Sequence, residues 1–309
     1  MPKTAILFAG QGAQSVGMGR DIAESSSPAA EIFERANEVV GYDIKKLCFE
    51  GPPEKLEQTD IQQPAIFTTS AAIWQALNSG RGIGEAPVAM AGLSLGEYTA
   101  LYAAGSVDFD DALRLVKRRG ELMQAASNAI PGGMVTALGL DPGKVQSICQ
   151  AASSAGTIGP ANFNCPGQIV ISGAGKACDL AEKLIEEASG RAVRLKVAGA
   201  FHSPLMKPAA ESLAQILADT PFETPKIPII ANVNCEFHGQ AVNIRQWLTD
   251  QLTQPIRWQE SMERLISQGV EQFIEIGPGK VLTGLMRKID RKIPVINLST
   301  ADALTQVAA

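Results

Sequence analysis

Short apolar runs alternate with longer segments of helical periodicity in the first part of the chain. The runs Thr4–Ala9 and Val88–Ala91 lack the polar alternation of a half-exposed strand, which is typical of buried strands. In Ala29–Val40, Ala65–Leu77 and Asp108–Ala126, apolar residues recur at helical spacing. This alternation of strands and helices predicts a parallel sheet and an α/β fold.

The middle of the chain has a different pattern, in which short strands and helices follow each other closely. The predicted order is strand, helix, strand, helix, strand, over Gly132–Leu140, Pro142–Ala152, Gln168–Ser172, Lys176–Ala188 and Arg191–Val197. Pro131-Gly132-Gly133 and Gly199 mark hinges at its two ends. We therefore predict a small α+β domain, residues 128–197, inserted into a larger domain that is formed by residues 1–127 and 198–309.

After the insert, the pattern returns to elements of the larger domain. The predicted elements are a helix at Pro208–Leu217, a strand at Ile227–Asn232, helices at Ile244–Leu252 and Ser261–Gln268, a strand at Gln272–Ile276, and a last helix after the turn Gly277-Pro278-Gly279-Lys280. The sequence contains no internal repeat and no low-complexity tract.

Composition and charge narrow the class of protein. The chain has 309 residues, of which 45% are hydrophobic and 19% charged, the profile of an ordinary globular protein. The formal net charge of -5 argues against a general nucleic-acid binder, and no apolar stretch is long enough to cross a bilayer. Five cysteines, an odd number without a C-x-x-C motif, favour a reducing, cytoplasmic setting over a disulfide framework or a zinc site.

The strongest chemical motif is Gly92-Leu93-Ser94-Leu95-Gly96, which follows a predicted strand and precedes a predicted helix beginning near Tyr98. A G-x-S-x-G sequence in this context is typical of a nucleophile elbow, in which a sharp turn raises a serine hydroxyl above the end of the strand. The N–H groups at the start of the following helix would point toward a developing oxyanion. The alternative is a tight turn whose serine has no chemical role.

A serine nucleophile needs a positioned base, and the chain contains only two histidines. His238 lies in the polar turn Phe237-His238-Gly239-Gln240, whereas His202 lies in a loop directly after a predicted strand. We therefore choose His202 by elimination, and a surface or capping histidine is the alternative. No acidic residue has the position of a third triad member. We expect a Ser-His dyad whose imidazole is aligned by a backbone or amide carbonyl.

Arg119 lies at the centre of the apolar face of the helix Asp108–Ala126, for which Ser106 or Asp108 is the expected N-cap. Burial of an unpaired guanidinium is costly, so Arg119 should meet a carboxylate from the protein or from a ligand, unless its side chain extends to water. The planar guanidinium suits bidentate binding of a carboxylate.

The loop Gly10-Gln11-Gly12 follows the first predicted strand. Because the carboxyl ends of parallel strands meet at one edge of a sheet, this loop should face the same crevice as Ser94. Gln11 is therefore a candidate for a second oxyanion donor. The loop also contains part of a dinucleotide-binding fingerprint, but the third glycine is not at the required spacing.

Five motifs of this chain occur together, and in this order, in one family. They are Gly10-Gln11-Gly12-Ala13-Gln14, Gly92-Leu93-Ser94-Leu95-Gly96-Glu97-Tyr98, Arg119-Gly120-Glu121-Leu122-Met123-Gln124, Gly199-Ala200-Phe201-His202-Ser203 and Glu275-Ile276-Gly277-Pro278-Gly279. Over essentially its whole length, the chain resembles the malonyl-CoA:acyl carrier protein transacylases of type II fatty acid synthesis. Many bacterial members have histidine directly before the nucleophile, where this chain has Leu93, so no role of that histidine is carried over.

The resemblance implies catalytic roles for five residues. Ser94 matches the acylated nucleophile and His202 its general base. Gln251 matches the residue whose main-chain carbonyl orients the histidine. Gln11 and Leu95 match the residues whose backbone N–H groups form the oxyanion hole.

The resemblance also implies the substrate contacts, the fold and the partners. Arg119 matches the clamp on the malonyl carboxylate, Asn162 a pocket position near the acyl group, and Phe201 the residue found in malonyl-selective enzymes. The family fold is a hydrolase-like core with a mostly parallel sheet and a ferredoxin-like insert. The implied partners are malonyl-CoA and the phosphopantetheine arm of an acyl carrier protein. Neither a metal nor a cofactor is expected, and we expect a monomer that binds neither nucleic acid nor membranes.

Two other classes of function stay open on the sequence. A serine hydrolase or thioesterase could use the same elbow, although the missing triad acid and the placement of Arg119 count against it. A non-catalytic acyl-binding protein would not need Ser94, His202 and Arg119 together. A polyketide system would use the same chemistry with a different carrier.

Overall fold

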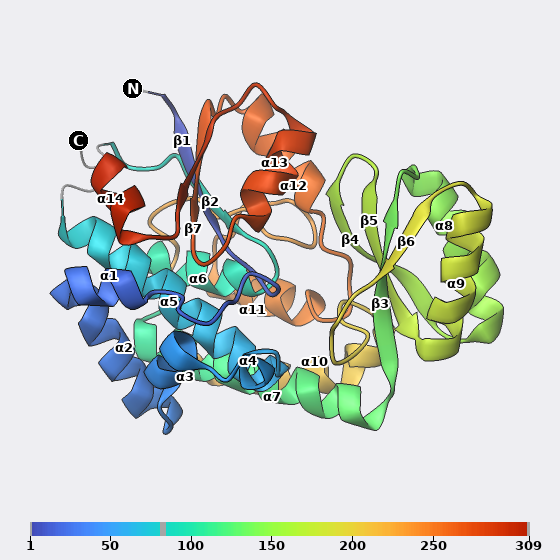
Figure 1. Cartoon of the computed structure of the whole chain (residues 1–309), viewed down its shortest axis with the longest axis horizontal. Helices are drawn as coiled ribbons and strands as arrows, with labels where there is room; N and C mark the ends of the chain where they lie inside the picture. Colours follow the sequence, from blue (N-terminus) through green and yellow to red (C-terminus); the bar gives the residue numbers. More distant parts are fainter. Residues whose placement is uncertain (1, 81–84, 308–309) are drawn as a thin grey trace.

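The computed structural model describes residues 2–80 and 85–307, and it contains two sheets in separate parts of the molecule (Figure 1). The larger part holds β1 (Thr4–Phe8), α1 (Arg20–Ser25), α2 (Ser27–Val40), α3 (Ile44–Glu50), α4 (Pro53–Leu56), α5 (Thr59–Ser79), β2 (Ala89–Gly92), α6 (Leu95–Ala103), α7 (Phe109–Ala129), α10 (Lys207–Asp219), α11 (Ala241–Asp250), α12 (Trp258–Ser267), β7 (Gln272–Ile276), α13 (Val281–Ile289), β8 (Val295–Leu298) and α14 (Ala301–Val307). The smaller part holds β3 (Gly132–Leu138), α8 (Pro142–Ala152), β4 (Ile158–Cys165), β5 (Gln168–Ala174), α9 (Gly175–Glu187) and β6 (Arg191–Arg194).

The sheet of the larger part has the order β2-β1-β7-β8, and all its strand pairs are parallel. Its central strand β1 is covered on both faces. Ile6 and Phe8 pack into one apolar cluster, and Ala5 and Leu7 pack into another on the opposite face. Burial on both faces explains why this strand is an apolar run without alternation. The predicted parallel sheet is confirmed.

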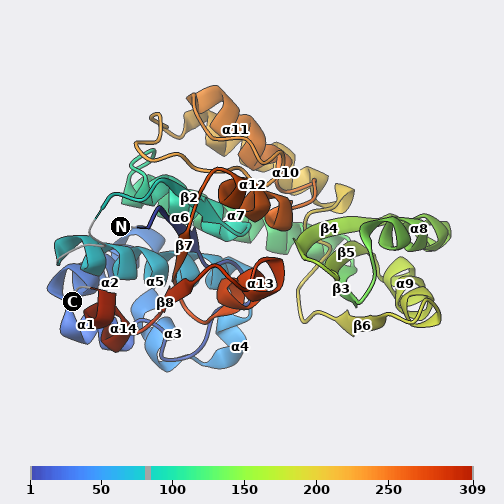
Figure 2. The ribbon, with the colours of Figure 1, turned by 90° about the horizontal axis from the view of Figure 1, so that it is seen from above.

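The sheet of the smaller part is antiparallel and has the order β4-β5-β3-β6. Figure 2 shows it beside the larger part, with α8 and α9 on its outer side. Val135 and Ile171 pack in a cluster with α8 and α9. Their neighbours Met134 and Val170 point to the other face, because side chains alternate along a strand, and they pack with the core of the larger part. The small sheet thus forms one wall of the space between the two parts.

The segment predicted as a strand over Ile227–Asn232 forms no strand. It makes only isolated bridges, from Ile229 to Met90 and from Ile230 to Phe237. Proline at position 228 lacks the N–H that a regular ladder would need. The segment then leads into a turn beginning at Asn232.

The sequence patterns did not predict β4, β8, α1, α3, α4 or α14. Near its start, strand β4 contains Gly159 and Pro160, which disfavour strands, and its register with β5 shifts between Pro160 and Asn162. Strand β8 has only four residues, and α4 has four. Such short segments contain too few residues to show a recognisable strand or helix periodicity.

No helix within the described part of the chain combines the length and the apolar character needed to span a membrane. All five cysteines are buried free thiols. Burial raises the pKa of the Cys48 thiol to about 12, so this group stays protonated and unreactive at neutral pH.

Candidate active site

Ser94 occupies a sharp turn between β2 and α6, and the two flanking glycines make this turn possible. The backbone of Ser94 has φ 52° and ψ −102°, a strained conformation for a residue with a side chain. A Cβ on Gly92 would lie 1.9 Å from the carbonyl carbon of Gly96, and a Cβ on Gly96 would lie 2.2 Å from the carbonyl oxygen of Phe8. Any larger residue at either position would therefore push the serine out of place.

The hydroxyl of Ser94 forms a hydrogen bond with His202, in the loop that follows β6. The distance from Ser94 Oγ to His202 Nε2 is 2.9 Å. On the other side of the ring, Nδ1 lies 2.6 Å from the main-chain carbonyl oxygen of Gln251. A carbonyl can only accept, so Nδ1 carries the proton and Nε2 is free to accept the proton of the serine. This arrangement can activate the hydroxyl without a third acidic residue.

The imidazole of His202 is held in its neutral form. Burial and, after it, the positive charge of Arg119 together lower its pKa from 6.5 to about 3, against the opposing effect of the hydrogen bond from Nδ1 to Gln251. His202 is 5% exposed, and its backbone also has a positive φ of 55°. At neutral pH this group is therefore unprotonated and available as a base.

Arg119 of α7 is completely buried, and its guanidinium reaches the same hydroxyl. Nη2 donates to Ser94 Oγ at 3.0 Å and to Gln251 Oε1 at 2.9 Å, and Nη1 donates to Gln63 Oε1 at 2.7 Å. The guanidinium carbon lies 5.1 Å from the ring centre of Tyr98. All of these partners are neutral, and burial lowers the pKa of Arg119.

The expected carboxylate partner of Arg119 is not supplied by the part of the chain that the structure describes, where no acidic side chain lies within ion-pair distance. The Nε atom of Arg119 is buried without a hydrogen-bond partner among the described residues. The protein-carboxylate alternative and the water-exposed alternative are therefore both wrong here. A ligand carboxylate is the alternative that this environment favours.

A cavity of about 310 Å³ opens onto Ser94 and His202. Three further predicted site residues, Gln11, Asn162 and Phe201, line it. Its walls come from both parts of the molecule, because Met134, Val170 and Leu195 of the smaller part also contribute. Apolar walls with a few polar groups are typical of a small-molecule site.

Of the two predicted oxyanion donors, Leu95 begins the helix that follows Ser94, and Gln11 lies in the loop after β1. Leu95 is fully buried and is the first residue of α6, so its N–H has no acceptor within the helix. Gln11 follows Gly10, at which a Cβ would lie 2.2 Å from the carbonyl oxygen of Leu93. This close approach brings the loop after β1 against the elbow, as the parallel sheet predicts.

Two polar residues behind the site, Asn232 and Glu97, were not predicted from the sequence. Asn232 Oδ1 accepts from the N–H of Ser94 at 2.7 Å, and its Nδ2 donates to the carbonyl of Gly92 at 2.8 Å. Glu97 of α6 is 1% exposed and lies 2.6 Å from His238 Nε2. The side chain of His238, which the sequence places in a polar turn, is buried against this carboxylate and does not reach the hydroxyl of Ser94.

Gln63 of α5 was also missed. It is fully buried and holds Nη1 of Arg119, while its Nε2 contacts the sulfur of Met123 at 3.3 Å. The sequence carries no signal for this role, because a glutamine on a helix is ordinary and only its burial shows that it requires a partner.

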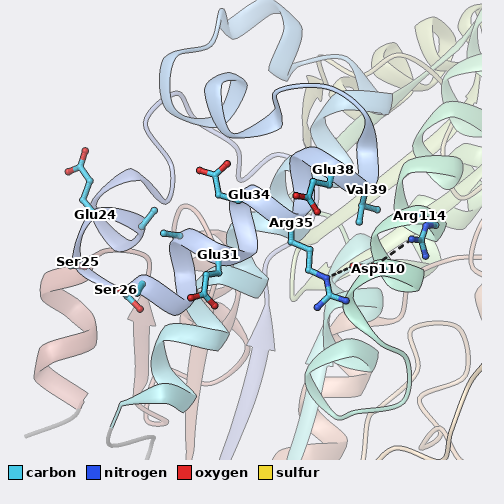
Figure 3. Close-up of a pocket in the computed structure, with 13 residues that line it drawn as sticks. Glu24, Ser25, Ser26, Glu31, Glu34, Arg35, Glu38, Val39, Asp110 and Arg114 are labelled. Atoms are coloured by element: carbon cyan, nitrogen blue, oxygen red, sulfur yellow. Dashed lines mark hydrogen bonds and ion pairs between the residues drawn. The ribbon is translucent and has the colours of Figure 1, made fainter.

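A second hollow lies between α1, α2 and the start of α7 (Figure 3). Four glutamates line it, and Arg35 pairs with Asp110 at 2.6 Å. None of its described lining residues is one of the predicted site residues. The chemistry predicted from the sequence therefore belongs to the cavity at Ser94.

Comparison with known proteins gives one consistent answer. A model of the acyl transferase domain family matches residues 6–301. The malonyl CoA-acyl carrier protein transacylase of Bacillus subtilis (strain 168) is 42% identical over 98% of this chain and 96% of its own length, and that of Escherichia coli (strain K12) is 42% identical over 100% and 98%. A solved malonyl-transacylase in complex with a type II polyketide acyl carrier protein is similar with a TM-score of 0.95, at 40% identity over 99% of both chains. The chain therefore belongs to the malonyl-CoA–acyl carrier protein transacylase family.

Proposed function

We propose that this protein transfers a malonyl group from coenzyme A to the phosphopantetheine thiol of an acyl carrier protein, through a malonyl ester of Ser94, and so supplies fatty acid synthesis. One observation carries the proposal. Ser94 Oγ lies within hydrogen-bond distance of a neutral imidazole, at 2.9 Å, and of a buried guanidinium, at 3.0 Å. This arrangement places a nucleophile, Ser94, and its base, His202, beside a cation, Arg119, that can bind a substrate carboxylate. The names of the family relatives point to the same substrates.

In the first half-reaction, Ser94 Oγ attacks the thioester carbonyl while its proton passes to His202 Nε2. The backbone N–H groups of Leu95 and Gln11 stabilise the oxyanion, and each such donor is typically worth about 3–4 kcal/mol. The tetrahedral adduct then collapses, the carbon–sulfur bond breaks, and the proton of His202 goes to the sulfur of coenzyme A. The malonyl group remains on Ser94 as an ester.

In the second half-reaction, the carrier's thiol gives its proton to His202 Nε2 and its sulfur attacks the ester. The carbon–oxygen bond to Ser94 breaks, and the serine oxygen takes the proton back. The main-chain carbonyl of Gln251 keeps the imidazole in the required tautomer at both steps. The free carboxylate of the malonyl group binds Arg119, while Asn162 and Phe201 shape the cavity around the acyl group.

We also propose finer features of the fold and setting. The order β3-α8-β4-β5-α9-β6, with its sheet order β4-β5-β3-β6, supports a ferredoxin-like insert at residues 128–197 in a hydrolase-like domain of residues 1–127 and 198–309. Five buried free thiols are in keeping with the cytoplasm. A monomer stays a prediction for sedimentation or light scattering.

The test is acylation followed by transfer. Incubation with malonyl-CoA should give a malonyl adduct in the intact mass of the protein, and Ser94→Ala should abolish it. Addition of carrier protein bearing the phosphopantetheine arm should move the malonyl group to the carrier. Continuous release of coenzyme A without a carrier would instead identify a hydrolase, and no adduct at all would indicate a non-catalytic binding protein.

A further inference from the structure

Glu97 has the sequence position of a local capping residue but does not act as one. Ser94 precedes α6 and Glu97 is the third helical residue, the S-x-x-E spacing of a capping box. In a capping box, the two side chains accept from each other's backbone N–H groups. Here the side chain of Ser94 makes no cap hydrogen bond, and its N–H donates to Asn232 instead. The carboxylate of Glu97 is therefore free for other partners.

Those partners come from two segments far along the chain. Oε1 of Glu97 lies 2.6 Å from His238 Nε2, whereas Oε2 accepts from Gln251 Nε2 at 2.7 Å and from the N–H of Asn232 at 3.2 Å. Asn232 in turn binds the backbone of the elbow on both sides of Leu93. Glu97 is not among the described residues that line the cavity. It therefore acts on the reaction from behind the site, through the residues that it holds.

We propose that Glu97 is a positioning residue for acyl transfer, which fixes the side-chain amide of Gln251 in one orientation. The amide lies between Arg119, which can only donate, and Glu97, which as a carboxylate only accepts. Only one orientation satisfies both, with Oε1 toward Arg119 at 2.9 Å and Nε2 toward Glu97 at 2.7 Å. The reversed amide would place donor against donor and acceptor against acceptor.

The same residue supplies the main-chain carbonyl that orients the catalytic base. Gln251 ends α11, and its carbonyl oxygen lies 2.6 Å from His202 Nδ1. Its Nε2 also donates to the carbonyl of Ser94 at 3.1 Å. An amide anchored by Glu97 therefore connects the nucleophile, the base and the carboxylate-binding arginine.

The amide also keeps two opposite charges apart. A carboxylate placed directly on Arg119 would occupy the donors that a malonyl carboxylate needs. Glu97 is instead linked to Arg119 by hydrogen bonds through the neutral amide of Gln251, and its other oxygen is used by His238, with the side chains of Glu97 and His238 both buried. Arg119 thus keeps the amide of Gln251 as a fixed hydrogen-bond partner, while its positive charge stays available to a substrate carboxylate. This step rests on the proposed function.

The experiment compares Glu97→Gln with a matched control, Glu275→Gln. Glu275 is also a fully buried carboxylate near a helix start, where it accepts from the N–H groups of Leu282 and Thr283 at 2.9 Å. Single-turnover acylation of Ser94 is measured with malonyl-CoA and with acetyl-CoA, per folded chain, and thermal unfolding gives the folded fraction. Glu97→Asp, which keeps the charge but withdraws the oxygens, is the second variant if Glu97→Gln does not fold.

Glu97→Gln should lower the malonyl acylation rate about 10- to 100-fold, the effect of losing a hydrogen bond to a charged group. It should also lower the ratio of malonyl to acetyl acylation, because both His202 and Arg119 lose their common support. Glu275→Gln should lose thermal stability and keep that ratio. Equal ratios in the two glutamine variants, or an Asp variant that acylates at the wild-type rate, would overturn the positioning role alone. Wild-type protein that forms no adduct would overturn the proposed function and this inference with it.

Discussion

Replacement of Arg119 by methionine is the sharpest perturbation of the proposed substrate choice. The guanidinium is completely buried, and its described partners Gln63, Gln251 and Ser94 are neutral. Methionine has a similar length and no charge, so it fills the same space without leaving a large cavity. Arg119→Met should therefore remove the cation and keep the packing of α7.

The expected magnitude follows from this burial. Removal of one partner from a buried ion pair costs about 3–5 kcal/mol, because the remaining charge is left without compensation. In kcat/KM for malonyl-CoA this corresponds to a loss of roughly 150- to 5,000-fold at 1.36 kcal/mol per factor of ten. Acetyl-CoA has no carboxylate and would suffer no such loss. Removal of the positive charge also raises the pKa of His202, which makes it a stronger base.

The assay measures transfer from malonyl-CoA and from acetyl-CoA to the same carrier protein. Malonyl transfer should collapse, whereas acetyl transfer should be retained or raised. Arg245→Met is the matched control, because Arg245 is a partly buried arginine that donates to the carbonyls of Leu217 and Thr220, away from the cavity. The control should lose stability but keep the preference for malonyl-CoA. Equal losses of both activities in Arg119→Met would refute the clamp.

Three other predictions follow from the geometry. Because the pKa of His202 is lowered to about 3 in the free enzyme, kcat/KM should stay constant as the pH falls through 6.5 and should drop only toward pH 3. In the substrate complex a bound carboxylate neutralises Arg119 and raises the pKa of His202, so kcat should begin to drop at a higher pH than kcat/KM. Profiles of both parameters against pH test this. The same lowered pKa means that neutral His202 contributes its full share to the free energy of unfolding above pH 6.5, and that this share, up to about 5 kcal/mol, is lost progressively as the pH falls toward 3. Urea unfolding of His202→Gln should not show this loss. Gly96→Ala should destabilise the protein and abolish acylation, because its Cβ would lie 2.2 Å from the Phe8 carbonyl, whereas Gly284→Ala, with open space around it, should be neutral or stabilising in thermal unfolding.

Much of the fold could be predicted because its central elements obey simple periodic rules. Strand β7 has the predicted bounds, and Asp108 caps α7 by accepting from the N–H of Asp111 at 2.8 Å. The misses are segments whose structure depends on neighbours. Strand β4 contains Pro160 and pairs with β5 in an irregular register, and the segment before Asn232 meets β2 at a single bridge. Local patterns do not report such pairings.

In the candidate site, too, some residues could be predicted from local sequence patterns and others could not. Ser94 and Arg119 could be singled out because their residue types are chemically unusual in their local patterns, and His202 by elimination between the two histidines. Gln63 and Glu97 could not, because their roles exist only through contacts across 56 and 154 positions of the chain. A glutamine or glutamate on a helix is ordinary in sequence, and only its burial reveals that it needs a partner.

The charge of Arg119 couples the basicity of His202 to the identity of the substrate. In the free protein, burial and the charge of Arg119 both lower the pKa of His202, so the imidazole is neutral but weakly basic. A carboxylate bound to Arg119 cancels that charge and raises the pKa of His202, whereas an acetyl group leaves the charge in place. A malonyl thioester would therefore meet a stronger base than an acetyl thioester, in addition to its direct contact with the guanidinium. The single arginine thus favours malonyl transfer twice, once in binding and once in the chemical step.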